Sequence, residues 1–320
     1  MGQLIEGRWH ADPPATGFAD GDGAFRRTTS GFRNWITADG RPGPSGEGGF
    51  AAESGRYHLY VSLACPWAHR TLIMRAFKDL ADIIDVSVVS PLMLEQGWTF
   101  ARQEGSSGDK IGGHAFLHQV YTAHQPDYSG RVTVPVLWDK QQGVIVNNES
   151  AEIIRMLNTA FNDLTGNRAD YYPQALRADI DAWNERIYPA VNNGVYRAGF
   201  ATSQQAYAEA YAEVFAELDH IDAHLAQHRY LLGEQLTEAD IRLFTTLIRF
   251  DAVYHGHFKC NRQRLEDFDA LPRYVRDIYR LPGVAATVDF EHIKTHYYAS
   301  HRNINPTGVV PVGPAVDYGA

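Results

Sequence analysis

A strand, a Cys-Pro pair and a helix follow one another in residues 57–80, and this pattern restricts the fold more than any other feature. Residues 57–63 (YHLYVSL) are rich in strand-forming side chains and predict a β-strand. Apolar residues recur at helical spacing from Cys65-Pro66 to Leu80, and a first-turn proline is tolerated because its missing N–H would have no helical partner there. Residues 84–90 predict a second strand. A strand, a helix and a strand in this order predict a parallel pair in an α/β domain.

The rest of the chain extends this unit and then changes character. Residues 132–138 and 143–146 predict a hairpin, and a helix opens at 147–150. The order β-α-β followed by β-β-α is that of the thioredoxin fold. From about Tyr171 the apolar spacing is helical, so we expect an α/β domain followed by an all-α domain. The expected divisions are an irregular N-terminal extension (1–55), a thioredoxin-like domain (56–165), a C-terminal helical-bundle domain (170–300) and an extended tail (301–320).

Two segments outside these elements carry separate expectations. Residues 91–130 are long, polar and contain glycines, so we interpret them as a functional insertion. The extension has little to bury around residues 40–49, but it contains aromatic side chains that predict docking onto the fold. These aromatic residues are Trp9, Phe18, Phe25, Phe32 and Trp35.

Composition narrows the class of protein. The 320 residues exceed one ordinary core and suit two domains, and the net charge of -9 argues against non-specific binding to nucleic acid or anionic membranes. The first residues lack the apolar run of a signal peptide, and no stretch approaches the roughly 20 apolar residues of a membrane span. Two cysteines are too few for a disulfide scaffold. We therefore expect a cytoplasmic protein with neither a nucleic acid nor a membrane as partner.

Cys65 is the candidate nucleophile because it opens a helix. Unpaired N–H groups and the helix dipole at that end favour the thiolate, and such placement lowers a thiol pKa from ~8.5 to roughly 3.5–7.5. Ala68 stands where a dithiol enzyme has its second cysteine, and Cys260 falls in the other predicted domain. A mixed disulfide on Cys65 therefore needs an external thiol, for which glutathione is the abundant cytosolic choice. An inert buried thiol is the alternative, and we keep that interpretation for Cys260.

The segment Thr133-Val134-Pro135 is the second signal. In thioredoxin-like folds this strand carries a proline after a cis peptide bond, which turns the preceding backbone toward the active site. The main chain of Val134 is then expected to pair with the cysteinyl backbone of glutathione. An edge-strand proline is the alternative.

The segment Asn148-Glu149-Ser150 at another helix start is the third signal. The γ-glutamyl end of glutathione carries an α-ammonium and an α-carboxylate. Glu149 is expected to hold the ammonium, and Ser150 with the helix N–H groups to hold the carboxylate. Ordinary helix capping by Asn148 or Ser150 is the alternative.

No metal site is expected. The fourteen histidines are scattered, and His255-Gly256-His257 has no accompanying cluster of metal ligands. No glycine-rich phosphate loop follows a predicted strand either. Glutathione, as a cosubstrate, is therefore the one small molecule that the pattern calls for.

These motifs carry a resemblance to a known family, and the matching segments cover nearly the whole chain. They include YVSLACPWAHRTLI, GRVTVPVLWDK, NNESAEIIRMLN and NNGVYRAGFA. The sequence resembles the Xi class of glutathione transferases, the S-glutathionyl-hydroquinone reductases. The resemblance implies a homodimer that reduces glutathionyl-hydroquinones to hydroquinones. It also implies that Cys65 is the nucleophile, that Trp98, Arg131, Val134, Glu149 and Ser150 bind glutathione, and that Tyr196, Tyr254 and Tyr297 line the aromatic-substrate pocket, with Tyr196 or Tyr297 as proton donor.

Three other functions stay open from the residues themselves. An omega-like thiol transferase or dehydroascorbate reductase would use the same Cys65 on other substrates. A conjugating transferase would activate glutathione with Ser or Tyr, which a cysteine at the helix start disfavours. A non-enzymatic, transferase-like binding protein is the third. The tyrosines are the weakest assignment, because seventeen occur and most tyrosines are packing residues.

Overall fold

The computed structural model describes residues 2–11, 21–102 and 105–319. Its chain packs as two compact units. Residues 28–169 form the first unit together with the first described residues at the N-terminus, and residues 170–319 form the second together with residues 21–27. The first unit is a thioredoxin-like domain and the second is helical, so the predicted fold class is confirmed.

A four-stranded sheet is the centre of the first unit, in the order β4-β3-β7-β8. β3 pairs parallel with β4 and antiparallel with β7, and β7 pairs antiparallel with β8. The predicted parallel pair and the predicted hairpin are both confirmed. The strands are β3 (Tyr57–Val61), β4 (Asp85–Val88), β7 (Val136–Asp139) and β8 (Val144–Asn147).

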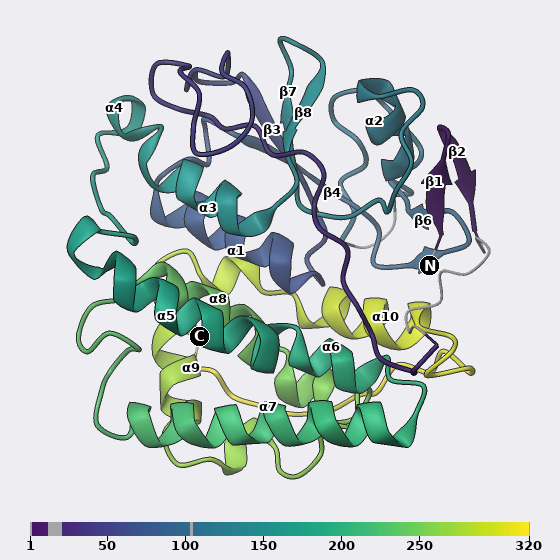
Figure 1. Cartoon of the computed structure of the whole chain (residues 1–320), viewed down its shortest axis with the longest axis vertical. Coiled ribbons are helices and arrows are strands. Elements are labelled where there is room, and N and C mark those ends of the chain that lie inside the picture. Colours follow the sequence, from purple (N-terminus) through teal and green to yellow (C-terminus); the bar gives the residue numbers. More distant parts are fainter. Residues whose placement is uncertain (1, 12–20, 103–104, 320) are drawn as a thin grey trace. The chain divides into compact units, whose positions relative to one another are not determined.

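Helices α1 (Pro66–Phe77) and α3 (Ser150–Thr159) pack side by side, as Figure 1 shows. α1 buries Ile73 and α3 buries Ile153, each completely, as expected for helices with one apolar face. The short helix α4 (Asn162–Thr165) follows and ends at Gly166, whose φ of 73° is the left-handed conformation of a helix C-cap.

An ion pair at one end of the sheet joins two strands. Arg56, directly before β3, donates through Nε (3.0 Å) and Nη2 (2.6 Å) to Oδ2 of Asp139, the last residue of β7. The other carboxylate oxygen of Asp139 accepts the backbone N–H groups of Gln141 and Gln142 in the hairpin turn. Both charged side chains are buried, so this pair ties the two central strands together from inside the protein.

The segment 91–130 contains more regular structure than the sequence indicated. It holds a two-stranded sheet of β5 (Met93–Leu94) and β6 (Gly97–Trp98), and an unpredicted helix, α2 (Leu117–His124). α2 contacts β6 and β8 and buries three side chains. Three buried residues within a helix of eight span little more than one turn, which is too short for a clear helical pattern, so this helix was missed.

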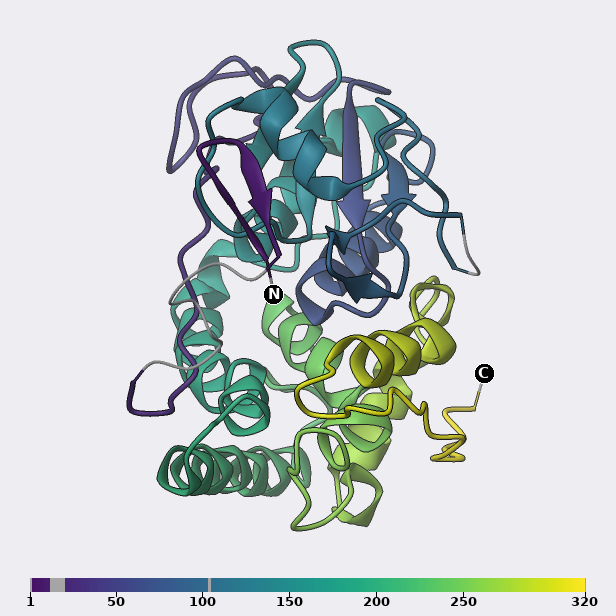
Figure 2. The ribbon, with the colours of Figure 1, turned by 90° about the vertical axis from the view of Figure 1, so that its right-hand side faces the viewer.

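The N-terminal extension is not wholly irregular. β1 (Gln3–Ile5) and β2 (Arg8–His10) form a small antiparallel sheet, which Figure 2 shows beside α2. Trp9 stacks on His118 of α2, with ring centroids 4.8 Å apart. Docking of the extension through its aromatic side chains is therefore confirmed at this point of the first unit.

Three further aromatic residues of the extension dock as well. Phe32 packs against Tyr121 (5.7 Å between ring centroids) and Trp35 is buried. In the helical unit, Phe25 packs against Phe200 at 5.5 Å. Phe18 lies outside the described residues.

The second unit is helical, as predicted. Helix α8 begins at the capping box of Thr237 and Asp240, which the sequence indicated. α10 was not predicted, because its buried face mixes Ile293 and Tyr297 with the buried histidines His292 and His296. The α-helices are α5 (Arg177–Ile187), α6 (Gly194–Gly199), α7 (Gln204–Leu225), α8 (Glu238–Leu247), α9 (Leu271–Tyr279) and α10 (Phe290–Ser300).

Short 3-10 and π-helical segments and an extended tail complete this unit. After residue 304 the described tail holds no regular element, as expected, and its Tyr318 stacks on Phe290 at 5.3 Å. The short elements are η1 (Gln174–Leu176), η2 (Tyr188–Asn192), η3 (Phe250–Tyr254), η4 (Leu265–Asp267) and η5 (Ala285–Thr287).

Candidate active site

Cys65 is the N-cap of α1, with extended backbone angles (φ -76°, ψ 120°). Its side chain is partly exposed, and its Sγ lies 3.6 Å from the carbonyl oxygen of Val134. The N–H groups of the first helical turn give this end of α1 a partial positive charge, which favours a thiolate. Cys65 is therefore both accessible and placed where sulfur is expected to ionise.

Cys260 has the opposite environment. It is completely buried, and this burial raises the pKa of its thiol to about 12. A thiol that stays protonated and out of contact with solvent is unreactive. The structure thus separates the two cysteines as the sequence analysis expected.

Val134 reaches Cys65 because two tyrosines hold the preceding segment. The bond between Val134 and Pro135 is cis, as predicted. The hydroxyl of Tyr121 accepts the N–H of Thr133 (3.2 Å) and donates to its carbonyl (2.9 Å). The hydroxyl of Tyr128 donates to the carbonyl of Arg131 at 3.3 Å. These bonds fix the backbone that directly precedes Val134.

Glu149 is the N-cap of α3, so the alternative that Asn148 or Ser150 caps this helix is wrong. Its Oε1 accepts the N–H of Ala151 at 3.1 Å, and its Oε2 accepts the hydroxyl of Ser30 at 3.0 Å. The side chain of Asn148 bonds elsewhere, to the N–H of Phe32 and the hydroxyl of Tyr121. The cap is a carboxylate held from two sides.

Ser150 lies at the same helix start beside a buried cation. Arg70 of α1 is 1% exposed, and its Nη1 donates to the Ser150 hydroxyl at 3.4 Å. The Arg70 guanidinium also lies 4.5 Å over the ring of Trp67. A hydroxyl, a buried guanidinium and the N-terminus of α3 together form a site that suits an anion such as a carboxylate.

The two other predicted glutathione ligands belong to the same unit. Trp98 is buried in β6, opposite Met93 of β5, and Arg131 precedes the Thr133–Pro135 segment. Sequence analysis missed Ser30 and Arg70 as site residues. The signal for Arg70 was its place five residues after Cys65 on the same helix, whereas nothing in the local pattern around Ser30 indicated its contact.

Three tyrosines of the helical unit meet in one cluster. The hydroxyl of Tyr297 lies 2.5 Å from that of Tyr196 and 3.2 Å from that of Tyr254. Tyr254 and Tyr297 are fully buried, and burial raises their pKa values well above the usual range. Phenols in this environment keep their protons at neutral pH, so their hydroxyls can donate hydrogen bonds. The structure therefore brings together the three tyrosines that the resemblance named, on α6, η3 and α10.

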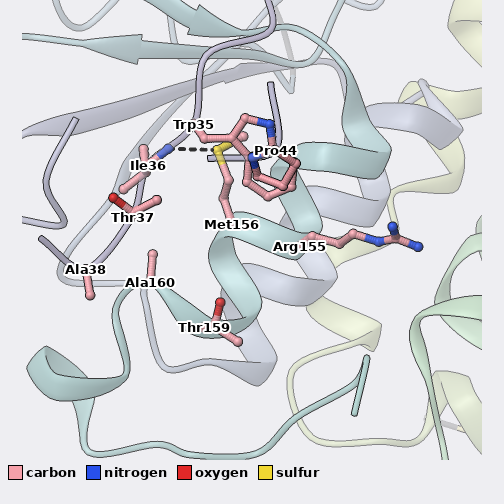
Figure 3. Close-up of a pocket in the computed structure, with 9 residues that line it drawn as sticks. All are labelled: Trp35, Ile36, Thr37, Ala38, Pro44, Arg155, Met156, Thr159 and Ala160. Atoms are coloured by element: carbon pink, nitrogen blue, oxygen red, sulfur yellow. Dashed lines mark hydrogen bonds between the residues drawn. The ribbon is translucent and has the colours of Figure 1, made fainter. Parts of the chain in front are cut away.

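A cavity of ≈ 330 Å³ lies elsewhere in the first unit, between α3 and the extension (Figure 3). At the wall of this cavity, the backbone N–H of Ile36 donates a hydrogen bond to Sδ of Met156, with the two atoms 3.0 Å apart. None of the predicted site residues lines this cavity. Its lining consists of Trp35, Ile36, Thr37, Ala38, Pro44, Arg155, Met156, Thr159 and Ala160.

Two further searches concern metals and membranes. Within residues 2–11, 21–102 and 105–319, no three His, Cys, Asp or Glu side chains come together as a metal site would require. In that same described part of the chain, no helix has the length and apolarity needed to cross a bilayer.

Comparison with known proteins gives matches over nearly the full length. Residues 64–160 match the family described as glutathione S-transferase, N-terminal domain, and residues 204–277 match its C-terminal domain. The glutathionyl-hydroquinone reductase YqjG of Escherichia coli is 60% identical over 99% of this chain and 96% of its own length. The glutathionyl-hydroquinone reductase PcpF of Sphingobium chlorophenolicum is 51% identical over 98% and 97%.

Solved structures agree with these sequence matches. The glutathione-bound structure of YqjG superimposes with a TM-score of 0.92 at 57% identity, covering 100% of this chain and 97% of that one. A Xi class transferase from Natrialba magadii gives a TM-score of 0.92 at 47% identity, covering 100% and 96%.

Proposed function

This chain belongs to the Xi class of the glutathione transferase family, and we propose that it acts as a glutathionyl-hydroquinone reductase with Cys65 as its nucleophile. The observation that carries the role of Cys65 is its position: an accessible thiol caps α1 beside the Val134 carbonyl. Ala68 supplies no second thiol in the motif.

The first step transfers glutathione to the enzyme. The Cys65 thiolate attacks the sulfur of the glutathionyl-hydroquinone and forms an S–S bond. The bond between that sulfur and the ring carbon breaks, and its electron pair stays on the carbon, which takes up a proton. Hydroquinone leaves, and sulfur is oxidised to the disulfide level while the ring carbon is reduced.

The second step regenerates the thiolate. A second glutathione, as its thiolate, attacks the mixed disulfide at the glutathione sulfur and displaces Cys65. Oxidised glutathione leaves, so one glutathionyl-hydroquinone and one glutathione give one hydroquinone and one oxidised glutathione. Glutathione is thus a cosubstrate, and the proposal uses no metal.

We assign the binding of glutathione to residues of the first unit. Glu149 takes the α-ammonium, and Ser150, backed by the Arg70 guanidinium and the helix N-terminus, takes the α-carboxylate. The Val134 main chain pairs with the cysteinyl residue, next to Cys65. Trp98 and Arg131 complete the ligand set by their match to the family motifs.

The proton for the ring carbon is assigned to the tyrosine cluster of the helical unit. Tyr196 and Tyr297 share a short hydroxyl–hydroxyl contact, and Tyr254 bonds to Tyr297. A donor in such a chain is replenished by its neighbour after it gives up its proton. Tyr254 is assigned to the aromatic-substrate pocket and Tyr196 or Tyr297 to the donor role.

The setting of the enzyme forms part of the proposal. We place it in the cytoplasm, where reduced glutathione is abundant and its two cysteines stay reduced. A homodimer is the proposed assembly. Nucleic acid and membranes are not proposed as partners, in line with the net charge of -9.

One preparation tests the function. Turnover of glutathionyl-menadiol with glutathione, followed as formation of oxidised glutathione, is expected to exceed turnover of hydroxyethyl disulfide, dehydroascorbate and a conjugation substrate. Cys65→Ser is expected to abolish it, because a hydroxyl cannot form the mixed disulfide. Faster turnover of dehydroascorbate or hydroxyethyl disulfide would instead identify an omega-like thiol transferase.

A further inference from the structure

Ser30, a residue of the N-terminal extension, bonds directly to the carboxylate of Glu149. Its Oγ lies 3.0 Å from Oε2 of Glu149 and 3.3 Å from the carbonyl oxygen of Asn148. The two partners are 119 residues apart in the sequence, so only the fold brings them together. The extension therefore contributes an atom to the proposed ammonium site.

The segment around Ser30 is held against this site by its backbone. The N–H of Asn148 donates to the carbonyl of Phe32 at 3.1 Å, and Phe32 N–H donates back to Asn148 Oδ1 at 3.1 Å. Arg33 forms an ion pair with Glu152 of α3. That hydrogen-bonded pair raises the pKa of Arg33, and Glu149 adds to the effect through its charge. The segment that carries Ser30 is thus anchored to the start of α3 on both the backbone and the side-chain level.

The geometry orients the Glu149 carboxylate and leaves it able to accept further hydrogen bonds. Oε1 accepts the Ala151 N–H and Oε2 accepts the Ser30 hydroxyl, so each oxygen keeps a lone pair for another donor. An α-ammonium has three donors and requires an acceptor at a fixed position. Two bonds on different oxygens prevent the carboxylate from rotating away.

We propose that Ser30 is a positioning residue that holds Glu149 for the α-ammonium, so that the N-terminal extension makes the enzyme select γ-glutamyl thiols with a free α-amino group. This inference rests on the proposed function, since it takes the site to be the glutathione site. Ser30 does not touch the reacting sulfur atoms. Its effect is expected on recognition of the ammonium alone.

The test compares two ligands that differ only in the amino group. S-methylglutathione and S-methyl-glutaryl-cysteinylglycine, which lacks the α-amino group, are titrated calorimetrically into the full-length enzyme. We expect Ser30→Ala to raise the Kd of S-methylglutathione by about 3- to 10-fold, because one hydrogen bond that orients a charged group is lost. The Kd of the desamino ligand is expected to stay unchanged, so the ratio of the desamino Kd to the S-methylglutathione Kd falls by the same factor.

Two variants serve as controls. Ser30→Thr keeps the hydroxyl and is expected to keep the wild-type ratio. Ser54→Ala makes the same chemical change at an exposed position of the same extension, away from Glu149 and from the Arg33–Glu152 pair, and is expected to leave the ratio unchanged. Agreement of both controls with wild type supports a specific role of Ser30.

The outcomes separate the two proposals. If Ser30→Ala weakens both ligands equally, or neither, the assignment of Ser30 is overturned while glutathione binding stands. If wild type binds neither ligand, the glutathione site and the role of Ser30 fail together. Because binding is measured without turnover, failure to reduce glutathionyl-hydroquinones would leave the result for Ser30 intact.

Discussion

Replacing Asp139 with asparagine tests how strongly the buried ion pair with Arg56 stabilises the first unit. The change keeps the size of the side chain, but it removes the charge and turns an acceptor into an NH₂ donor. Oδ1 can still accept the N–H groups of Gln141 and Gln142. The new NH₂ group then faces the Arg56 guanidinium, which has only donors.

The size of the effect follows from the partners that Arg56 keeps. Breaking a buried ion pair by removing one partner costs about 3–5 kcal/mol, because a charge is left buried without compensation. Arg56 retains bonds to Glu53 (2.8 Å) and to the carbonyl of Gly49 (2.9 Å). We therefore expect the free energy of unfolding of Asp139→Asn to fall by about 2–4 kcal/mol.

Asp163→Asn is a matched control for this substitution. Asp163 also pairs with an arginine, Arg168, at 2.8 Å, but the two side chains are 77% and 72% exposed. An exposed pair contributes only about 0–1 kcal/mol. Both variants are compared with wild type by urea unfolding, reading the midpoint at constant slope. Equal losses in the two variants would refute the argument that burial makes the Arg56–Asp139 pair important.

Three further predictions concern the nucleophile and its proton donor. Iodoacetamide is expected to alkylate Cys65 with a midpoint well below pH 8, because the helix N-terminus favours the thiolate; a midpoint near 8.5 would remove that argument. After incubation with oxidised glutathione, mass spectrometry is expected to find one glutathionyl group, on Cys65, and a group on the buried Cys260 would be a clear miss. Tyr297→Phe is expected to lower kcat for glutathionyl-menadiol by about 10²-fold or more while leaving the Kd of S-methylglutathione unchanged, and unchanged kcat would exclude Tyr297 as donor.

The elements with strong local patterns were predictable from sequence. The strand before Cys65, the helix after it and the capping box of Thr237 and Asp240 each depend on residues within one or two turns. Helix α2 escaped because it buries only three side chains, and α10 because two of its buried residues are histidines. Local pattern identifies an element only when its buried residues are apolar and the element is long enough to show their period.

The candidate site divides in the same way. Short sequence motifs contain Cys65, Val134 and Glu149, and the residues next to each of them indicate its chemical role. Glu149 caps α3, and the side chain of Asn148 instead forms hydrogen bonds with Phe32 and Tyr121. The sequence around Asn148 does not show these two distant partners. The contact of Ser30 with Glu149 closes a loop of 119 residues and has no local signature. Long-range contacts of this kind follow from the fold and not from any window of sequence.

The path of the chain between the two units has an evolutionary consequence. The chain leaves the helical unit after residue 27 and returns to it at residue 170, and Phe25 from that early segment packs against Phe200. A recombination event with one crossover near residue 170 would exchange most of the helical unit but leave Phe25 behind, opposite a partner it did not evolve with. New transferases of this architecture are therefore expected to arise by substitution within whole genes more readily than by exchange of the C-terminal part of the chain.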